Sequence, residues 1–362
     1  MVSMFDVKEI YNAYLACRLE KRSSPDALLF EMNQEEEILR LADELNKKTY
    51  LPSTSVCFYL NKPKSREIFA AHFRDRIVHH IIYSRLAPTW EKIFIDQSFA
   101  CRPEKGTHKG AGVLQDYCRK ITKSGKQKAY YLKLDVANFF MSIDKNILYK
   151  ILARKCSDSE LLWLIHVSLF HDPTTDVMNI GRASYAGKLP PHKSLFNAKP
   201  HCGLPIGNLT SQFFANVYLN ELDQYAKHVL KCHYYLRYVD DFVLLSISKG
   251  QLLQWKVDIV QFLWQRLHLD LNPEATKLDG IFHGVDFCGY IVRPFYMLVR
   301  RRVVGNLKSK LDDVYPKLVY KTTDRIMYYY DTKVLERLLA TLNSYLGHFS
   351  PVSYTHLRAH ET

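Results

Sequence analysis

Two adjacent carboxylates interrupt an apolar stretch in the second half of this 362-residue sequence. Asp240 and Asp241 follow Tyr238-Val239 and precede an apolar run, so they lie at the turn of an expected hairpin. Neighbouring ionised carboxylates repel each other, and unpaired buried carboxylates are costly. A divalent cation removes both penalties, because Mg²⁺ prefers oxygen ligands and typically takes one or two carboxylates plus substrate phosphates. The pair therefore predicts a Mg²⁺ site.

A third carboxylate, Asp135, ends a second apolar strand that begins near Tyr130. If the two strands are neighbours, Asp135, Asp240 and Asp241 form one acidic pocket. Two Mg²⁺ ions about 4 Å apart could there activate a 3′-hydroxyl and stabilise a leaving pyrophosphate, and Mn²⁺ could substitute. The alternative is that Asp240 and Asp241 only cap a tight turn, where Asp is common. The motifs around them favour the metal site.

The elements that must position these acids are strands separated by helices. Helical periodicity indicates helices within 6–50, 74–94, 145–170, 211–231 and 251–268. Strands are expected at 53–60, 130–136, on both sides of Asp240-Asp241, at 287–292, and at 297–302 as partner of the last. Residues 171–203 lack periodicity and predict a long loop. The pattern indicates an α+β sheet domain followed by a basic helical lobe.

The bulk composition is that of a globular protein with a basic surface. The net charge of +13 and pI near 9.2 favour a polyanionic partner, either nucleic acid or an acidic membrane, although a protein that is simply basic is the alternative. The eight cysteines show no C-x-x-C spacing, which argues against a zinc ribbon and indicates free thiols in a reducing compartment. Without a secretory signal or a stretch near ~20 apolar residues, we expect a soluble cytoplasmic protein with no membrane partner.

Seven segments resemble, in order, the motifs of the reverse transcriptase family. They are Lys64-Ser65-Arg66 with Asp75-Arg76-Ile77-Val78; Gln97 to Arg102 with Gly106, His108 and Gly110; Leu134 to Phe140 with Ile143-Asp144; Gly203 to Gln212; Tyr238 to Asp241; Leu271-Asn272-Pro273 through Lys277; and Phe287-Cys288-Gly289-Tyr290. The resemblance implies an α+β right-hand polymerase with fingers, a palm of antiparallel sheet plus helices, and a helical thumb. It implies an RNA-directed DNA polymerase, a nucleotidyltransferase, that uses template RNA, a primer or cDNA strand, and deoxynucleoside triphosphates.

The resemblance also implies roles for individual residues. The catalytic Asp135, Asp240 and Asp241 would bind the two Mg²⁺ ions, with the Val136 carbonyl as a further ligand. Arg66 would hold the triphosphate of the incoming nucleotide, since its planar fork suits phosphate; the alternative is a solvated turn charge.

Two further residues would contact the nucleotide. Phe140 matches the position whose aromatic ring excludes a ribose 2′-hydroxyl; the alternative for this ring is core packing. Lys277 could protonate the leaving pyrophosphate, although the family's lysine stands two residues earlier, where this chain has Ala275.

One departure narrows the resemblance. Most of the family has Gln-Gly-x-x-x-Ser-Pro in the second palm motif, whereas this chain has Ile206, Gly207, Ser211 and Gln212 at those four positions. This variant, with Leu189 to Phe196, resembles the reverse transcriptases of diversity-generating retroelements. Such enzymes copy a template-repeat RNA into cDNA with errors opposite adenine, together with a small basic accessory protein. Ile206 has no polar atom, so a lost hydrogen bond near the nascent pair would loosen base discrimination; a core isoleucine is the alternative.

The expected domains follow these motifs. Residues 1–130 form N-terminal helices and fingers, 131–298 the palm with fingers or insertion elements at 145–200, 299–350 a truncated thumb, and 351–362 a non-native tail. In the thumb, the basic side chains expected along the template–primer duplex are Arg300, Arg301, Arg302 and Lys308, followed by Lys310 and Lys317.

The sequence is also compatible with two other functions. One is a different bacterial reverse transcriptase, of the group II intron, retron or phage-defence type. Intron proteins usually keep the Gln and Pro and add a maturase region. The other is a catalytically idle RNA-binding scaffold, against which the three intact acids argue. The source is expected to be bacterial, archaeal or phage.

Overall fold

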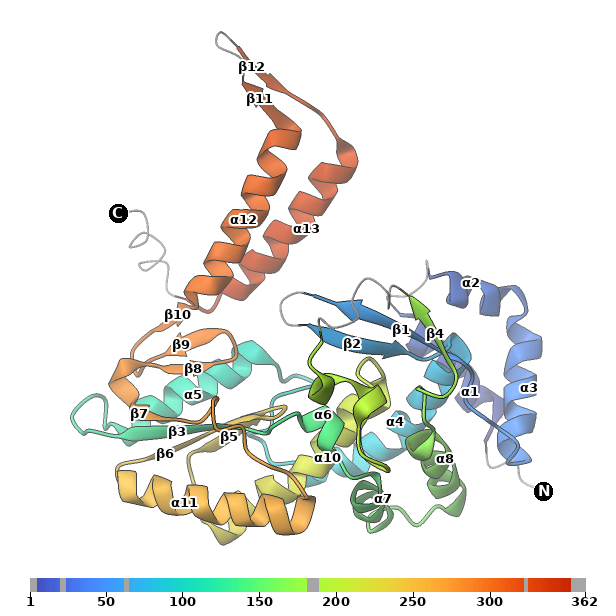
Figure 1. The fold of residues 1–362 in the computed structure, drawn as a ribbon, viewed down its shortest axis with the longest axis horizontal. Coiled ribbons are helices and arrows are strands. Elements are labelled where there is room, and N and C mark those ends of the chain that lie inside the picture. Colours follow the sequence, from blue (N-terminus) through green and yellow to red (C-terminus); the bar gives the residue numbers. More distant parts are fainter. Residues whose placement is uncertain (1–4, 20–23, 62–64, 181–188, 322–324, 353–362) are drawn as a thin grey trace. The chain divides into compact units, whose positions relative to one another are not determined.

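The chain forms two compact units, each assembled from three separate stretches of sequence. The computed structural model describes residues 5–19, 24–61, 65–180, 189–321 and 325–352 (Figure 1). The first unit comprises Met1–Asp96, Asp135–Lys231 and Lys256–Glu274, and the second comprises Gln97–Leu134, Cys232–Trp255 and Ala275–Thr362. The boundaries between fingers, palm and thumb stay a prediction. Of the expected tail, 353–362 lies outside the described residues, as does Lys64.

The first unit combines helices with a three-stranded sheet. Its elements are α1 (Val7–Arg18), α2 (Pro25–Met32), α3 (Gln34–Asn46), β1 (Ser55–Leu60), β2 (Arg66–Ala70), α4 (Phe73–Ile93), α6 (Phe139–Ser142), α7 (Lys145–Ala153), α8 (Ser159–Phe170), β4 (Val177–Ile180), η1 (Pro191–Lys193), η2 (Leu195–Asn197), α10 (Leu209–Gln224) and the π-helical turns η3 (Tyr225–Val229) and η4 (Leu263–Leu267). The sheet has the order β2-β1-β4, with β1 antiparallel to β2 and parallel to β4 (Figure 1).

Local sequence explains several boundaries in this unit. The carboxylates of Asp144 and Asp158 accept hydrogen bonds from backbone N–H groups in the first turns of α7 and α8, which satisfies donors that a helix leaves unpaired. Strand β4 lies in the stretch expected to be a loop, so that prediction was wrong there. The strand is stabilised by pairing with β1, more than a hundred positions earlier, and such distant pairing leaves no periodic signal in its own sequence.

The second unit contains a four-stranded sheet with the order β5-β6-β3-β7 and a three-stranded sheet with the order β10-β9-β8. Its elements are α5 (Thr107–Ile121), β3 (Tyr130–Asp135), β5 (Tyr235–Tyr238), β6 (Asp241–Ser246), β7 (Lys277–Gly280), η5 (Ile281–His283), β8 (Val285–Phe287), β9 (Tyr290–Val292), β10 (Met297–Val299), α12 (Arg301–Leu318), β11 (Val319–Lys321), β12 (Ile326–Tyr328) and α13 (Thr332–Phe349). Helix α11 (Lys249–Phe262) follows β6 along the chain.

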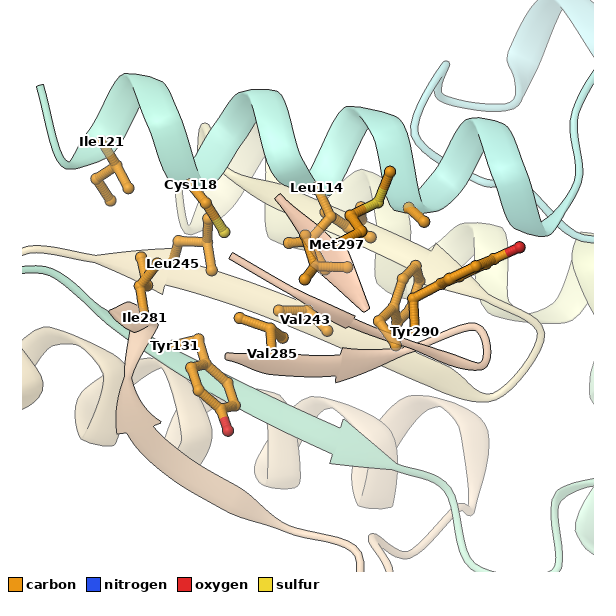
Figure 2. Packing of buried hydrophobic residues seen from close by; sticks show 14 of the residues in the cluster. Leu114, Cys118, Ile121, Tyr131, Val243, Leu245, Ile281, Val285, Tyr290 and Met297 are labelled. Carbon is orange, nitrogen blue, oxygen red and sulfur yellow. The ribbon is translucent and has the colours of Figure 1, made fainter. Parts of the chain in front are cut away.

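A large apolar cluster organises the second unit. Figure 2 shows Leu114, Cys118 and Ile121 on one face of α5 pointing toward the strands, where Val243 and Leu245 of β6 meet them. The spacing of the three α5 residues is that of one helix face, and the two β6 residues alternate as one face of a strand. The core therefore holds α5 against the strand that begins at the acidic turn.

The segment expected to be one strand at 287–292 is a hairpin. Its turn is formed by Cys288 (φ 51°) and Gly289 (φ 93°), between β8 and β9. Two successive residues with positive φ are typical of the tight turns that join antiparallel strands. The expected partner strand is confirmed, since Met297 pairs with Val292 in β10.

Among the described residues, no helix combines the length and the apolar character that crossing a membrane requires. All eight cysteines are free.

Candidate active site

The two acids of the β5–β6 hairpin lie at a strained turn. Antiparallel pairing brings Tyr238 opposite Asp241, so Val239 and Asp240 form the connection. Val239 has a φ of 56°, a left-handed conformation that costs a β-branched residue on the order of 1–3 kcal/mol. Asp240 and Asp241 are half-buried. The expected hairpin is confirmed, and its turn is held in a conformation that the local sequence disfavours.

Arg237 supports this turn and was missed by sequence reasoning. Its side chain is fully buried, with Nη1 donating to the Val239 carbonyl oxygen at 2.8 Å and Nη2 donating to Ser98 Oγ at 3.1 Å. The Arg237 backbone also pairs with Gln97 and Phe99 on either side of Ser98. An arginine inside the otherwise apolar Tyr235-Leu236 strand was the available signal, because charged side chains are rarely buried without partners.

Asp135 ends β3, and the sheet order places β3 beside β6, which begins at Asp241. The predicted neighbourhood of the two strands is therefore confirmed. Asn272 holds the end of β3: its backbone N–H donates to the Asp135 carbonyl at 2.8 Å, and its Nδ2 donates to Asp135 Oδ2 at 3.3 Å. Val136 is buried and bridges to Leu271. The motif Leu271-Asn272 thus positions a carboxylate, a role not assigned from the sequence.

Lys133 provides a cation beside the acidic turn. Its Nζ lies 2.8 Å from Asp241 Oδ2 and donates to the Asp286 carbonyl oxygen at 2.9 Å. Lys133 and Asp135 are two positions apart on β3, so their side chains leave the same face of the strand. This ion pair balances the charge of Asp241 and was not anticipated.

The carboxylates suit a hard divalent cation because aspartate oxygens are Mg²⁺ ligands. Within the described ranges, however, no three or more His, Cys, Asp or Glu side chains gather closely enough to hold a metal ion. Lys133 would compete with a metal for Asp241. The assignment of Asp135, Asp240 and Asp241 to two Mg²⁺ ions therefore stays a proposal.

Lys277 is the first residue of β7 and pairs in register with Lys133. Its ammonium lies over the Tyr131 ring at 5.9 Å from the centroid and 3.7 Å from Asp279 Oδ2. The hydrogen bond with Tyr131 raises the pKa of the Lys277 ammonium, and Asp279 adds to this. A raised pKa keeps Lys277 protonated but makes its ammonium a weaker acid, so its role as a proton donor stays a prediction.

Phe140 lies on α6 in the first unit, next to Phe139. Phe139 is buried, whereas Phe140 is half-buried, and the two rings are 5.6 Å apart. The more deeply buried Phe139 thus carries more of the packing, and the nucleotide contact of Phe140 stays a prediction. The Phe140 carbonyl accepts a hydrogen bond from Leu204 N at 2.7 Å, which ties α6 to the second palm motif.

Ile206 and Gly207 form a loop against β2. The Ile206 carbonyl accepts a hydrogen bond from Phe69 N at 2.8 Å, and the Ile206 side chain is half-buried. Gly207 has a φ of 126°, and a Cβ there would lie 2.9 Å from both the Phe69 carbonyl oxygen and Ile68 Cγ2. Only glycine fits this position, because it has the necessary φ and lets the two backbones approach.

The remaining predicted residues differ in exposure. Ser211 is buried in α10 and Gln212 is exposed on the same helix. Arg66 is exposed as the first residue of β2, as a phosphate contact requires.

The basic residues of the expected thumb are mainly at the start of α12. Arg300 is half-buried and paired with Asp286, whereas Arg301, Arg302 and Lys308 are exposed. Helices α12 and α13 pack on each other, and across these two fully described helices no side chain is buried. At the end of α13, the His348 carbonyl accepts a hydrogen bond from the Tyr290 hydroxyl at 2.6 Å, which fixes the helix to β9.

Comparison with known proteins identifies the family. Residues 47–292 match the model of the reverse transcriptase (RNA-dependent DNA polymerase) family, which is more than half of the chain. The chain belongs to this family, and its class of enzyme is RNA-directed DNA polymerase. The α+β fold predicted from the motifs is confirmed.

Individual relatives are distant. Protein YkfC of Escherichia coli K12 is 25% identical over 310 residues, which cover 76% of each chain. The group II intron-encoded protein LtrA of Lactococcus lactis subsp. cremoris is 21% identical over 370 residues, which cover 83% of this chain and 57% of LtrA. The telomerase of Candida albicans, solved with a fragment of telomeric RNA, aligns with a TM-score of 0.49 and 13% identity over 90% of this chain and 58% of that one. The chain thus spans little more than half the length of LtrA and of this telomerase.

Proposed function

We propose that this chain is the reverse transcriptase of a diversity-generating retroelement. It copies a template-repeat RNA into adenine-mutagenised cDNA that diversifies a target gene by mutagenic retrohoming. The observation that carries this proposal is the second palm motif, where Ile206 and Gln212 replace the Gln and Pro of most of the family. Ile206 is half-buried at a loop whose backbone joins β2, the strand that carries Arg66. An apolar side chain there offers no hydrogen bond to a nascent base pair.

The chemistry is nucleotidyl transfer, for which Asp135, Asp240 and Asp241 would hold two Mg²⁺ ions, or Mn²⁺ as a substitute, together with the Val136 carbonyl. Bound Mg²⁺ would activate the primer 3′-hydroxyl and stabilise the leaving pyrophosphate. Lys133 neutralises Asp241 until a cation competes for that carboxylate.

Three residues handle the incoming deoxynucleoside triphosphate. Arg66 binds its phosphates, the Phe140 ring excludes a 2′-hydroxyl, and protonated Lys277 gives its proton to the leaving pyrophosphate. The exposure of Arg66 and the half-buried ring of Phe140 support these roles.

The partners are template RNA, a primer or cDNA strand, and a small basic accessory protein. The basic surface supports the first two, because Lys and Arg bind phosphates independently of sequence. We place the reaction in the cytoplasm of a bacterial or archaeal cell, with the enzyme encoded by the cell or by a phage.

Primer extension on an RNA template tests the polymerase chemistry. Wild type should extend a DNA primer when Mg²⁺ is present, and Asp240→Ala should lower the rate by about a thousandfold or more, as expected when a metal ligand is lost from a site that relies on metal-ion catalysis. Asp43→Ala, which changes an exposed acid on α3, is the matched control and should extend normally. No Mg²⁺-dependent synthesis by wild type would instead support an RNA-binding scaffold.

The error spectrum tests the retroelement assignment. Sequencing of cDNA should show wild-type misincorporation concentrated opposite template adenine, and Ile206→Gln should reduce it. Val229→Gln introduces the same side chain at a position that is 64% exposed and should leave the spectrum unchanged. An unchanged spectrum in Ile206→Gln contradicts the role of Ile206, and faithful copying by wild type favours another bacterial reverse transcriptase.

A further inference from the structure

Glu67 is a buried carboxylate that the proposed mechanism does not use. Its side chain is 2% exposed, although it follows the exposed Arg66 on β2. Its Oε1 accepts hydrogen bonds from the Tyr59 hydroxyl at 2.9 Å and from Ser194 Oγ at 3.0 Å, and its Oε2 accepts one from Leu195 N at 2.7 Å. Glu67 therefore joins the β1–β2 hairpin to a segment 127–128 positions away.

The same strand is held at its other end by the second palm motif. Phe69 N donates to the Ile206 carbonyl at 2.8 Å, and Ala71 N donates to Asn208 Oδ1 at 3.4 Å. The Phe69 ring packs against Phe196 with centroids 5.6 Å apart. Strand β2 thus contacts both segments that resemble the diversity-generating enzymes, Leu189 to Phe196 and Ile206 to Gln212.

The segment that Glu67 anchors also reaches Phe140. Gly203 N donates to the Ile143 carbonyl at 2.9 Å, and Leu204 N donates to the Phe140 carbonyl at 2.7 Å. A Cβ on Gly203 would lie 2.7 Å from Leu195 Cδ1, so this part of the segment packs closely on the residue whose N–H Glu67 accepts. Hydrogen bonds and packing therefore connect Glu67 to Phe140, as β2 connects it to Arg66 and Ile206.

We infer that Glu67 is a positioning residue for the incoming deoxynucleotide, acting through Arg66, Phe140 and Ile206 without touching the substrate. Successive strand residues point to opposite faces, so the contacts of Glu67 inside fix the direction in which Arg66 leaves the strand. A carboxylate suits this position because its two oxygens accept from several donors at once. The inference rests on the proposed function, because it takes the nucleotide contacts of Arg66, Phe140 and Ile206 as given. It adds that Glu67 holds all three in position.

Steady-state kinetics of single-nucleotide addition test the inference. Glu67→Ala should raise KM for the deoxynucleotide on the order of 10-fold to 100-fold, since sub-ångström to 1 Å misplacement of contact groups has effects of this size. It should also reduce the preference for deoxy- over ribonucleotides, with a smaller change in kcat. Glu67→Gln should have a KM close to that of wild type. Its amide oxygen can accept from Leu195 N, while its amide nitrogen donates to the Ser194 or Tyr59 hydroxyl.

Asp158→Ala is the matched control. Asp158 also accepts two backbone hydrogen bonds in the first unit, from Glu160 N and Leu161 N, but at the start of α8. Its loss should lower the melting temperature without changing KM or sugar selectivity. Equal kinetic changes in Glu67→Ala and Asp158→Ala, or none in either, would overturn the inference.

Two milder variants keep the test decisive if Glu67→Ala fails to fold. Ser194→Ala and Tyr59→Phe each remove one donor to Glu67, and each should raise KM in the same direction by a smaller factor. Unchanged KM in both overturns the inference. A wild-type chain without Mg²⁺-dependent synthesis overturns the proposed function and this inference with it, whereas an active wild type with unaffected variants overturns the inference alone.

Discussion

Each of the two units contains a buried charged side chain that supports a proposed functional segment, but the two side chains fix different kinds of structure. In the second unit, Arg237 donates to the carbonyl of Val239, only two residues along the same hairpin, and to Ser98. In the first unit, Glu67 accepts from the Tyr59 hydroxyl, from the Ser194 hydroxyl and from the Leu195 backbone N–H. Both side chains reach a segment more than a hundred positions away, Ser98 for Arg237 and Ser194 for Glu67. Arg237 fixes one strained turn, whereas Glu67 fixes strand β2 against a second segment.

This difference indicates how the two regions should respond to change. The β5–β6 turn carries the proposed metal ligands, so its displacement should lower kcat. Strand β2 and its supporting segments carry the proposed nucleotide contacts, so their displacement should raise KM and weaken selectivity. The predictions below test that division, beginning with the largest effect.

Arg237→Met should lower kcat by on the order of 100-fold with little change in KM. The substitution keeps the apolar stem but leaves the Val239 carbonyl and the Ser98 hydroxyl without this donor in a buried place, and the strained turn relaxes. Single-turnover primer extension measures the effect. Arg154→Met, at an exposed arginine, controls for the loss of charge. A rise in KM at constant kcat in Arg237→Met would contradict the assignment of kcat effects to the β5–β6 turn and of KM effects to strand β2.

Gly207→Ala should destabilise the first unit and raise KM about tenfold. The new Cβ would lie 2.9 Å from the Phe69 carbonyl oxygen at a φ of 126°, which costs on the order of 1–3 kcal/mol and pushes the loop away from β2. Thermal unfolding and nucleotide titration measure both effects. Gly112→Ala is the comparison, because a Cβ there meets nothing within 4 Å. Equal melting temperatures for the two variants would show that the loop does not need glycine.

Phe140→Ala should reduce the preference for deoxynucleotides about tenfold or more, which is the scale of discrimination that a small steric difference in a pocket provides. The loss of the ring admits a 2′-hydroxyl, while the buried Phe139 keeps the packing of α6. Competition between a deoxy- and a ribonucleotide in primer extension measures the ratio. Phe140→Tyr retains the ring and should retain the preference; a ratio unaffected by either change assigns the Phe140 ring to packing.

Replacement of Arg301 and Arg302 by Ala should have the smallest effect, a weaker affinity for RNA–DNA duplex with little change in KM or kcat at saturating duplex. Each lost phosphate contact should reduce the slope of log affinity against log salt by about 0.9. Binding titrations at several salt concentrations give the slope, with Lys47→Ala, at the exposed residue that follows α3, as the surface control. Identical slopes for the double variant and wild type would exclude these arginines from the duplex contact.

Much of the active region was predictable from the order of residue types. An acidic pair between apolar strands predicts a hairpin with carboxylates at its turn, and the structure confirms both the hairpin and the neighbouring strand that ends on Asp135. The family follows from the same motifs, because each needs only a short, continuous segment with fixed spacing. These features depend on local alternation and turn chemistry, which a sequence displays directly.

Other features needed the tertiary structure. Strand β4 forms because β1 is there to pair with it, and Glu67 is buried because Ser194 and Leu195 supply donors from more than a hundred positions away. The sequence around Lys133 does not predict its ion pair with Asp241. The sequence by itself determined which atoms could do the chemistry, while only the fold decided which partners hold them, because burial and hydrogen bonding between distant segments have no local pattern to read.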